Sequence, residues 1–230
     1  IDSNGTLIDL LNGKEDINNK IIRTVGDADI KIFEDSLRIL RAIRFATTLG
    51  FKLDDELKTA IINHKDLLKN LSYYRKKEEL DKVFSSPNAM SGISLIRELG
   101  LDEVLDLSNL DTLVPTTYLI GVWAQVGDID KYSFNNTEKD SIIKIRELLN
   151  KDLLNYNNLY KYGLYLSTIV SEIKGIDKKI VNERYNSLYI HNKTDIKIEP
   201  MEVCELLGKK PGKFLKDIMN DIEYKLINKL

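Results

Sequence analysis

Cysteine, histidine and proline are scarce in this sequence, and the first two shortages each remove a class of site. Cys204 is the only cysteine, which excludes an internal disulfide framework and a cysteine metal cluster and leads us to expect a reducing, cytoplasmic location. The only histidines, His64 and His191, lie far apart with no ligand pattern around them, so we interpret both as ordinary surface or core residues. The longest apolar runs are too short to span a membrane, and we expect no membrane partner.

The charged residues are abundant but nearly balanced, with a net charge of −2 over 230 residues. A composition of 43% hydrophobic and 30% charged residues is typical of a globular protein with a real core. Lysine outnumbers arginine, yet four of the eight arginines lie between Arg23 and Arg44. Because the planar guanidinium suits phosphates and base edges, this local cluster indicates function more strongly than the net charge does.

The sequence pattern predicts a mostly α fold, a multi-helix array preceded by a short β remnant of an α/β domain. "TLIDLLNG", residues 6–13, predicts a strand closed by an Asn12-Gly13 turn, and a lone strand leads us to expect the body of a sheet domain upstream. From Phe33 onward the apolar spacing predicts helices nearly to the end. The first has an apolar stripe of Leu37, Leu40, Ile43 (or Phe45) and Leu49, and the last, in the tail, has Phe214, Ile218, Ile222 and Leu226 on one face. The predicted caps of these helices are Gly50, Asp54, Ser86 (with Pro87 as first helical residue) and Thr137.

"FEDSLRILRAIRF", residues 33–45, predicts one helix that carries carboxylates and arginines on a common face. At about 100° per residue, Glu34, Asp35, Arg38 and Arg41 fall within a sector of about 120°, and Arg44 lies about 60° further along. One interpretation is a solvated face with ion pairs one turn apart, each stabilising the helix by a few tenths of a kcal/mol.

The other interpretation rests on donors and acceptors. A carboxylate only accepts hydrogen bonds and a guanidinium only donates them. A fixed Asp–Arg pair would therefore match the amino group and ring nitrogen of cytosine or adenine, and would reject guanine and uracil. The remaining arginines would bind a triphosphate through charge-assisted bonds. Such a helix would serve as a protein template for two nucleotides.

At these residues the chain resembles the bacterial class II tRNA nucleotidyltransferase and poly(A) polymerase superfamily, and within it the CCA-adding enzymes. "IRTVGD" and "EDSLR" stand where the family has its hinge and its nucleotide-selecting E-D-x-x-R. Asp9, Gly13 and Arg23 match the D-x3-G-x9-R motif that flexes between catalytic head and neck. "SYYRKKEELDK" is similar to the S-x-E-R-x-x-x-E-L-x-K segment, with Tyr74 in place of a glutamate, and "LLGKKPGKFLKDI" to the G-x-x-P-G tail motif.

The resemblance implies roles for these residues. Asp35 and Arg38 would pair with the base of incoming CTP or ATP, and Arg41 and Arg44 would line the pocket nearer the phosphates. Glu34 would brace Arg38, or would act only as an acid at a helix N-terminus. The lysines around the tail motif would meet the tRNA elbow, although a solvated lysine face is an equal alternative; these are Lys209, Lys210, Lys213 and Lys216.

The resemblance also implies a division of the chain. Residues 1–32 would be the last part of a nucleotidyltransferase head, 33–107 the nucleotide-selecting and RNA-binding neck, 108–195 the body and 196–230 the tail. The family's paired-carboxylate G-S-x4-D-x-D motif, which places Mg²⁺ ligands in the head, does not occur in these 230 residues. We therefore expect this chain to select nucleotides and hold the tRNA 3′ end and elbow, and to be inactive in transfer by itself.

Other functions share parts of this pattern. A poly(A) polymerase fragment carries the same motifs, a stand-alone helical RNA-binding module could use the arginines to hold phosphates, and a helical scaffold would bind nothing. Trp123 and the tyrosines at 156, 160, 162 and 165 have mostly helical spacing, which favours core packing over base stacking. The sequence predicts no particular oligomeric state.

Overall fold

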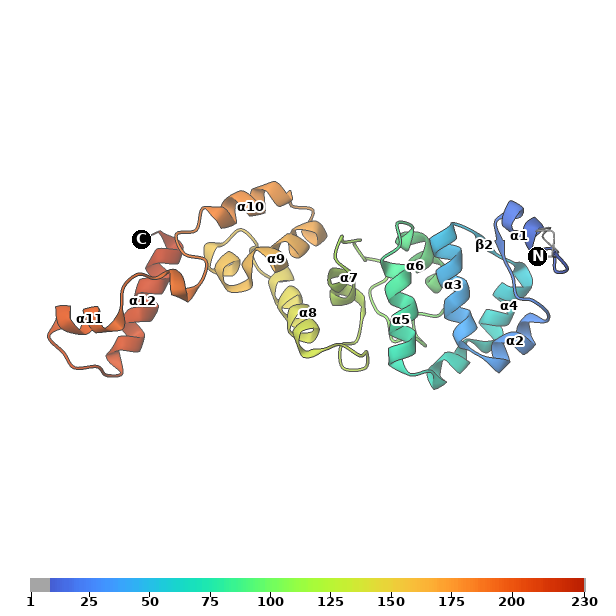
Figure 1. Cartoon of the computed structure of the whole chain (residues 1–230), viewed down its shortest axis with the longest axis horizontal. Coiled ribbons are helices and arrows are strands. Elements are labelled where there is room, and N and C mark those ends of the chain that lie inside the picture. The colour runs from blue at the N-terminus through green and yellow to red at the C-terminus, as the bar shows by residue number, and fades with distance from the viewer. Residues whose placement is uncertain (1–8, 230) are drawn as a thin grey trace, which may run out of the picture. The chain divides into compact units, whose positions relative to one another are not determined.

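Helices make up nearly all of the regular structure in residues 9–229, the part of the chain described by a computed structural model (Figure 1). This confirms the predicted mostly α fold. The chain divides into two compact units, one of residues 1–115 and 122–139 and the other of residues 116–121 and 140–230. The four functional segments expected from the sequence stay a prediction, because compactness alone divides the chain at other places.

The elements follow in chain order. The first unit contains α1 (Gly13–Asn19), β1 (Ile21–Ile22), α2 (Ala28–Glu34), α3 (Leu37–Leu49), β2 (Lys52–Leu53), α4 (Asp55–His64), the 3₁₀ helix η1 (Lys65–Asn70), α5 (Tyr73–Phe84) and α6 (Ala89–Glu98). Both units share α7 (Leu119–Val126) and α8 (Asn136–Leu149). The second unit contains α9 (Tyr156–Lys174), α10 (Lys178–Asn186), the 3₁₀ helix η2 (Lys193–Asp195), α11 (Pro200–Leu207) and α12 (Phe214–Asn228).

The segment before α1 does not end in the predicted strand and turn. Residues 6–8 lie outside the described part, and the backbone from Asp9 to Asn12 is irregular. The Asp9 carboxylate accepts hydrogen bonds from the backbone N–H groups of Gly13 (2.9 Å) and Lys14 (2.8 Å). These bonds satisfy donors that a helix start leaves free, so Asn12-Gly13 opens α1 instead of closing a hairpin.

A small sheet is nevertheless present. β1 and β2 pair in parallel, with Ile21 opposite Lys52 and Ile22 opposite Leu53. Both strands contact α3, so the pair forms one side of the first unit. Among the described residues, the β structure thus lies at residues 21–22 and 52–53, and residues 9–12 of the predicted strand and turn are irregular.

The predicted single helix over residues 33–45 is in fact two helices. α2 ends at Glu34 and α3 begins at Leu37, because Asp35 has an extended backbone with φ −150° and ψ 98°. Asp35 Oδ1 accepts a hydrogen bond from the Leu37 N–H at 3.1 Å. A short Asp side chain that binds the backbone two residues ahead competes with helix continuation. Glu34 and Asp35 therefore do not share a helical face with the arginines.

α3 packs against both strands and against α2, α5 and α6, and it carries most of the predicted apolar stripe. Leu40 and Ile43 are buried as predicted, whereas Phe45 and Leu49 are 44% and 54% exposed. Gly50 ends the helix in the left-handed conformation, φ 65°, which confirms the predicted C-cap. Burial of one side of α3 leaves its opposite side, which carries Arg38 and Arg41, facing solvent.

Of the next two predicted helix starts, the structure confirms one and moves the other. Asp54 is the residue before α4, as predicted. Ser86 instead begins a turn in which its Oγ accepts a hydrogen bond from the Asn88 N–H at 3.2 Å, and α6 starts only at Ala89. Pro87 lies inside this turn, so the helix begins two residues later than predicted.

α8 also starts differently. Asn135 Oδ1 accepts a hydrogen bond from the Glu138 N–H at 2.9 Å, and the Glu138 carboxylate accepts one from the Asn135 N–H at 2.8 Å. This reciprocal pair is a capping box, so Asn135 is the cap and Thr137 lies within the first turn.

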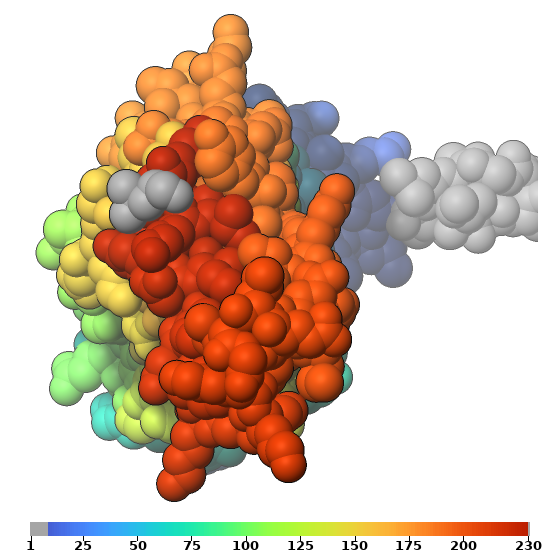
Figure 2. Space-filling view, turned by 90° about the vertical axis from the view of Figure 1, so that its left-hand side faces the viewer, coloured from blue at the N-terminus to red at the C-terminus, as the bar shows by residue number. Residues whose placement is uncertain are grey.

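In the second unit, α10 and α12 both pack against α9. α9 is interrupted at Gly163, whose φ of 74° and ψ of 169° are open mainly to glycine. The predicted tail helix is confirmed as α12, with Phe214, Ile218, Ile222 and Leu226 half-buried. The space-filling view in Figure 2 shows the surface of α11 and α12 in orange and red. In residues 9–229 no helix is long and apolar enough to cross a membrane.

The aromatic residues divide between core and surface. Trp123 is 1% exposed and contacts the rings of Phe84 and Tyr132, which confirms its predicted core packing. Tyr162 is also buried, whereas Tyr165 is 53% exposed. Core packing therefore accounts for some of the predicted tyrosines but not for all of them.

We expect Gly92→Ala to lower the free energy of unfolding by about 1–3 kcal/mol, a typical cost of overpacking. A methyl group there would lie 2.3 Å from Thr47 Oγ1 and 2.7 Å from Val83 Cγ1. Thr47 is held by its own 2.7 Å hydrogen bond to the Ile43 carbonyl, so the clash should outweigh the roughly 1 kcal/mol gained in helix propensity. Urea unfolding measures the change, with the exposed Ser94→Ala as control. A Gly92→Ala protein as stable as the parent would show that the α3–α6 contact is loose.

Candidate nucleotide-binding site

A groove of about 450 Å³ runs along the exposed side of α3 in the first unit. Strand β1 and the residues just after it form one wall, and α3 forms the other. Its lining is basic and apolar: Arg23, Lys31, Arg38 and Arg41, with Ile22, Thr24, Val25, Ala42, Phe45 and Leu57. Of the residues predicted to bind nucleotide, the groove thus brings together Arg38 and Arg41.

The groove carries uncompensated positive charge. Arg23 lies 3.1 Å from Asp16 and 3.9 Å from Asp54, and Lys31 lies 2.8 Å from Glu34. Arg38 and Arg41 are exposed, and within residues 9–229 neither guanidinium has a carboxylate partner. Since the lining residues include no carboxylate, the groove suits an anion.

The shape of the lining suits a flat group attached to that anion. Arg38 and Arg41 lie about one helical turn apart, with Ala42 and Phe45 on the following turn. Guanidinium planes and aromatic rings stack on heterocycles, and the fork of donors on each guanidinium binds phosphate oxygens. The arrangement therefore fits a base together with a phosphate group. The sequence analysis missed Lys31 and Phe45 as lining residues, although the basic and aromatic character of the segment signalled them.

The acidic residues of the E-D-x-x-R segment lie beside this groove and not in its lining. Asp35 binds the Leu37 N–H through Oδ1 and lies 3.8 Å from Arg75, and its side chain is one third exposed. The Glu34 carboxylate is paired with Lys31, so the contact expected between Glu34 and Arg38 is not formed in this structure. The role of Asp35 in recognising the base therefore stays a prediction.

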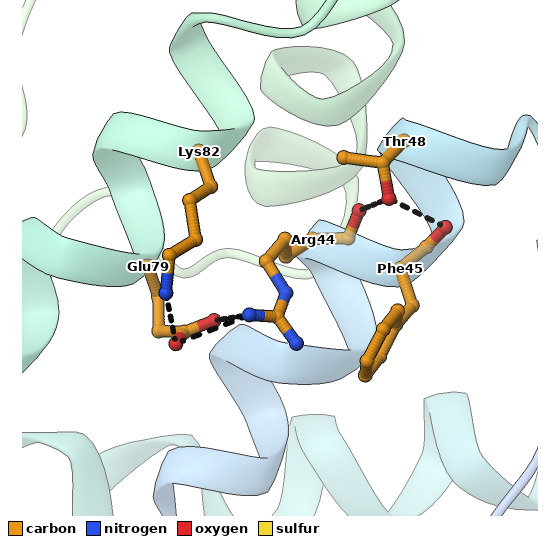
Figure 3. A network of polar contacts seen from close by, with 5 residues as sticks. All are labelled: Arg44, Phe45, Thr48, Glu79 and Lys82. Carbon is orange, nitrogen blue, oxygen red and sulfur yellow. Dashed lines mark hydrogen bonds and ion pairs between the residues drawn. The ribbon is translucent and has the colours of Figure 1, made fainter.

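Arg44 is the one arginine of the helix that the protein itself binds (Figure 3). Its Nη1 lies 3.2 Å from a carboxylate oxygen of Glu79, and the guanidinium stacks 4.2 Å from the centre of the Phe45 ring. Lys82 lies 3.2 Å from the same carboxylate. The Arg44 and Glu79 side chains are only 19% and 7% exposed, so this pair fixes α3 against α5.

Other residues shared with the S-x-E-R-x-x-x-E-L-x-K segment also hold α5 in place. Ser72 is the N-cap of α5 and accepts a hydrogen bond from the Arg75 N–H at 3.4 Å. Arg75 approaches Asp35 from α5, while Tyr74 is 60% exposed. Arg75 and Glu79 of α5 therefore contact the two ends of the arginine segment, at Asp35 and Arg44.

The D-x3-G-x9-R residues form one local structure. Asp9 caps α1 through Gly13 and Lys14, and these backbone hydrogen bonds hold the pKa of the Asp9 carboxyl below its usual value. Arg23 links the residues after β1 to Asp16 of α1 and to Asp54 before α4. Their role as a hinge stays a prediction.

The predicted tail lysines surround the turn between α11 and α12. All four are exposed, and Lys209 Nζ lies 5.6 Å from the centre of the Phe214 ring. In the described part of the chain, none of the four forms an ion pair. The lysines are therefore available to an anionic partner, although nothing in this arrangement selects RNA.

The residues of this groove do not fit a magnesium ion. Within residues 9–229 no cluster of His, Cys, Asp or Glu has the arrangement of a metal site. His64 Nε2 lies 2.8 Å from Asp29, and His191 Nε2 lies 3.2 Å from the Tyr185 carbonyl oxygen, which confirms that both are satisfied within the protein. A groove lined by four cations would repel Mg²⁺, so no metal-dependent step is assigned to these residues.

We expect Glu79→Ala to lower the free energy of unfolding by about 3 kcal/mol, because it leaves the largely buried Arg44 charge without its partner. Glu78→Ala, an exposed position on the same helix, is the matched control and should change stability by less than about 0.5 kcal/mol. Denaturant unfolding of both variants, with Arg44→Ala and the double variant, gives the coupling energy. Equal effects of Glu78→Ala and Glu79→Ala would contradict the fixing role of this pair.

Comparison with known proteins shows similarity to RNA-binding and tRNA nucleotidyltransferase families. Residues 50–107 match the family described as the probable RNA and SrmB-binding site of polymerase A, and residues 128–230 match putative domain 2 of tRNA nucleotidyltransferase. A CCA-adding enzyme from Geobacillus sp. (strain WCH70) is 29% identical, and the match covers 99% of this chain and 64% of that protein.

Two solved structures of CCA-adding enzymes are similar to this chain over nearly its whole length. The Bacillus stearothermophilus CCA-adding enzyme in complex with CTP superposes with a TM-score of 0.81 at 25% identity, covering 99% of this chain and 66% of that one. The Thermotoga maritima CCA-adding enzyme complexed with tRNA shares the fold, with a TM-score of 0.64 at 20% identity over 97% of this chain and 63% of that one.

The chain spans less than two thirds of the length of these proteins. With its motifs at matching spacing, it is similar over nearly its whole length to the C-terminal portion of the class II CCA-adding enzymes.

Proposed function

We propose that this chain is the nucleotide-selecting and tRNA-holding part of an enzyme that adds CCA to tRNA 3′ ends without a nucleic-acid template. The observation that carries the proposal is the groove on α3, where Arg38 and Arg41 have no counterion among residues 9–229 and face an anion-sized space. The relatives that cover the whole chain are CCA-adding enzymes, and solved relatives are described as bound to CTP and to tRNA.

The groove provides the donors for nucleotide selection, and Asp35 beside it provides an acceptor. Asp35 Oδ1 is used by the Leu37 N–H, which leaves the other carboxylate oxygen for the amino group of cytosine or adenine. Arg38 would donate to the adjacent ring nitrogen, and Arg41 would reach the triphosphate. Arg44 would act indirectly, by holding α3 through Glu79, and not by contacting the phosphates.

The chemistry of transfer belongs outside these residues. Mg²⁺ would be held by carboxylates of a catalytic head, where it would activate the tRNA 3′-hydroxyl and neutralise the triphosphate. The residues described here would bind and orient CTP, ATP and tRNA. As an enzyme of tRNA processing, the protein would act in the cytoplasm.

Poly(A) polymerase activity is the second candidate. The match of residues 50–107 to a region of polymerase A favours it, and the groove would accept ATP equally well. The two activities differ in their products, because a CCA-adding enzyme stops after three nucleotides and a poly(A) polymerase extends with ATP alone. A stand-alone RNA-binding module would show no preference among free nucleotides.

We expect Asp35→Asn to relax nucleotide selection in a protein that joins a catalytic head to this chain. The amide still accepts the Leu37 N–H, so the start of α3 is preserved, but it also donates to the carbonyl of uracil or guanine. Discrimination against UTP and GTP should fall by about 1–3 kcal/mol, a typical value for one base-edge contact. Arg38→Ala should lower kcat/KM for both CTP and ATP. The measurement is kcat/KM for four nucleotides on one tRNA; a uniform loss with intact preference would make Asp35 a helix cap only.

We expect the 230-residue chain alone to bind tRNA without extending it. It lacks the paired-carboxylate motif, and its net charge of −2 implies few neutralised phosphates and thus a shallow dependence of log K on log salt. Incubation with tRNA lacking its 3′ CCA, Mg²⁺, CTP and ATP tests extension, and a salt titration tests binding. Nucleotide addition above the blank would contradict the assignment of chemistry to a separate head, and absence of binding at low salt would contradict the tRNA-holding role.

A further inference from the structure

Aromatic and cationic side chains from α9, α10 and α12 and the segments after them meet at one place in the second unit. Tyr156 opens α9, Arg184 lies in the last turn of α10, Tyr189 follows α10, and Lys229 follows α12. The Arg184 guanidinium lies 3.7 Å from the centre of the Tyr156 ring. Lys229 Nζ lies 5.1 Å from the centre of that ring and 5.2 Å from the centre of the Tyr189 ring. We call these four residues the Tyr156 cluster.

Hydrogen bonds and an ion pair between the elements hold the cluster in place. Asn157 and Asn228 bind each other through both side-chain amides, at 2.9 and 3.2 Å, which ties the start of α9 to the end of α12. Tyr160 donates to Glu223 at 2.8 Å, and Lys193, after α10, lies 3.0 Å from Glu223. Arg184 Nε donates to the Leu154 carbonyl at 3.2 Å, which fixes its guanidinium over the ring. The cluster is therefore built by contacts among three helices.

The cluster carries positive charge that the protein does not neutralise. Across residues 9–229, neither Arg184 nor Lys229 forms an ion pair, although the acidic Glu183 and Glu223 lie on the same helices and bind other lysines. The hydrogen bond from Ser187 is the main cause of a lowered pKa of the Tyr156 hydroxyl, and the nearby Lys229 and Arg184 lower this pKa further. Tyr189 is 66% exposed, so one face of an aromatic ring lies open beside these cations.

We propose that the Tyr156 cluster is an RNA-binding site that takes a phosphate between Arg184 and Lys229 and stacks one unpaired base on Tyr189. Proteins bind unpaired RNA by combining exposed aromatic rings, on which bases stack, with Arg and Lys at the phosphates. An acidic peptide would use the cations but would leave the open tyrosine face without a partner of matching shape. The site rests on the proposed tRNA-holding function and extends it to residues that belong neither to the nucleotide-selecting groove nor to the tail lysines.

The test is equilibrium binding of the complete chain to a tRNA transcript that lacks its 3′ CCA, measured at several salt concentrations. Tyr189→Leu should weaken binding about tenfold at fixed salt, because it removes one stacked base, and should leave the salt slope unchanged. Tyr189→Phe keeps the ring and should bind like the parent chain. Lys229→Ala should weaken binding and lower the log–log salt slope by about one, since one phosphate contact is lost.

Matched controls separate this site from general effects. Tyr224→Leu removes a tyrosine that is 53% exposed on α12, and Lys225→Ala removes a lysine of α12 that is paired with Asp221 at 2.8 Å. Both should bind tRNA like the parent, and circular dichroism should show every variant folded. Parent-like binding by Tyr189→Leu and Lys229→Ala would overturn the RNA site while the tRNA-holding function stands. Failure of the unaltered chain to bind at low salt would overturn both.

Discussion

The ion pair between Arg44 of α3 and Glu79 of α5 is the contact on which the presentation of the arginine helix depends. A buried ion pair adds little net stability, because desolvation of both charges offsets most of their attraction. Its effect is geometric. Because Arg44 is held toward α5 and the apolar side of α3 is packed in the core, the orientation of α3 about its own axis is fixed. This orientation leaves Arg38 and Arg41 on the open side, in the groove.

The net charge of the chain is near zero, but positive and negative side chains line different hollows of the first unit. The groove along α3 is lined by four cations and no acid, while a second hollow is lined by Asp27, Asp29, Asp55 and Glu56. The acids that lie near the groove pair with Arg23 and Lys31, whereas Arg38 and Arg41 have no carboxylate partner within residues 9–229. A groove lined by cations favours anions, while the balanced net charge limits nonspecific attraction elsewhere.

The second unit leaves its cations without a carboxylate partner in a different way. In the groove, Arg38 and Arg41 stay unpaired, because no carboxylate of residues 9–229 lies within ion-pairing distance of them. In the Tyr156 cluster, Glu223 is already occupied by Tyr160 and Lys193, and an aromatic ring supports Arg184 in place of a counterion. A cation held on a ring keeps its charge available to a phosphate, whereas one held by a carboxylate does not. Each unit thus contains exposed cations, Arg38 and Arg41 in one and Arg184 and Lys229 in the other, that have no carboxylate partner among residues 9–229.

The sequence by itself determined the mostly α fold, the motifs of the arginine segment and the membership of Arg38 and Arg41 in the candidate site, because apolar periodicity and residue spacing are local properties of the chain. It also fixed Gly50 as a helix end, since a left-handed residue after an apolar stripe favours glycine. It did not reveal that Asp35 breaks the helix, because only a side-chain bond to the Leu37 N–H decides between one helix and two. The partner of Arg44 lies 35 residues away on α5, and the residues of the Tyr156 cluster come from three separate helices or the segments after them. Such contacts depend on how helices pack against each other, so only the tertiary structure decided which arginines remain free to bind a ligand.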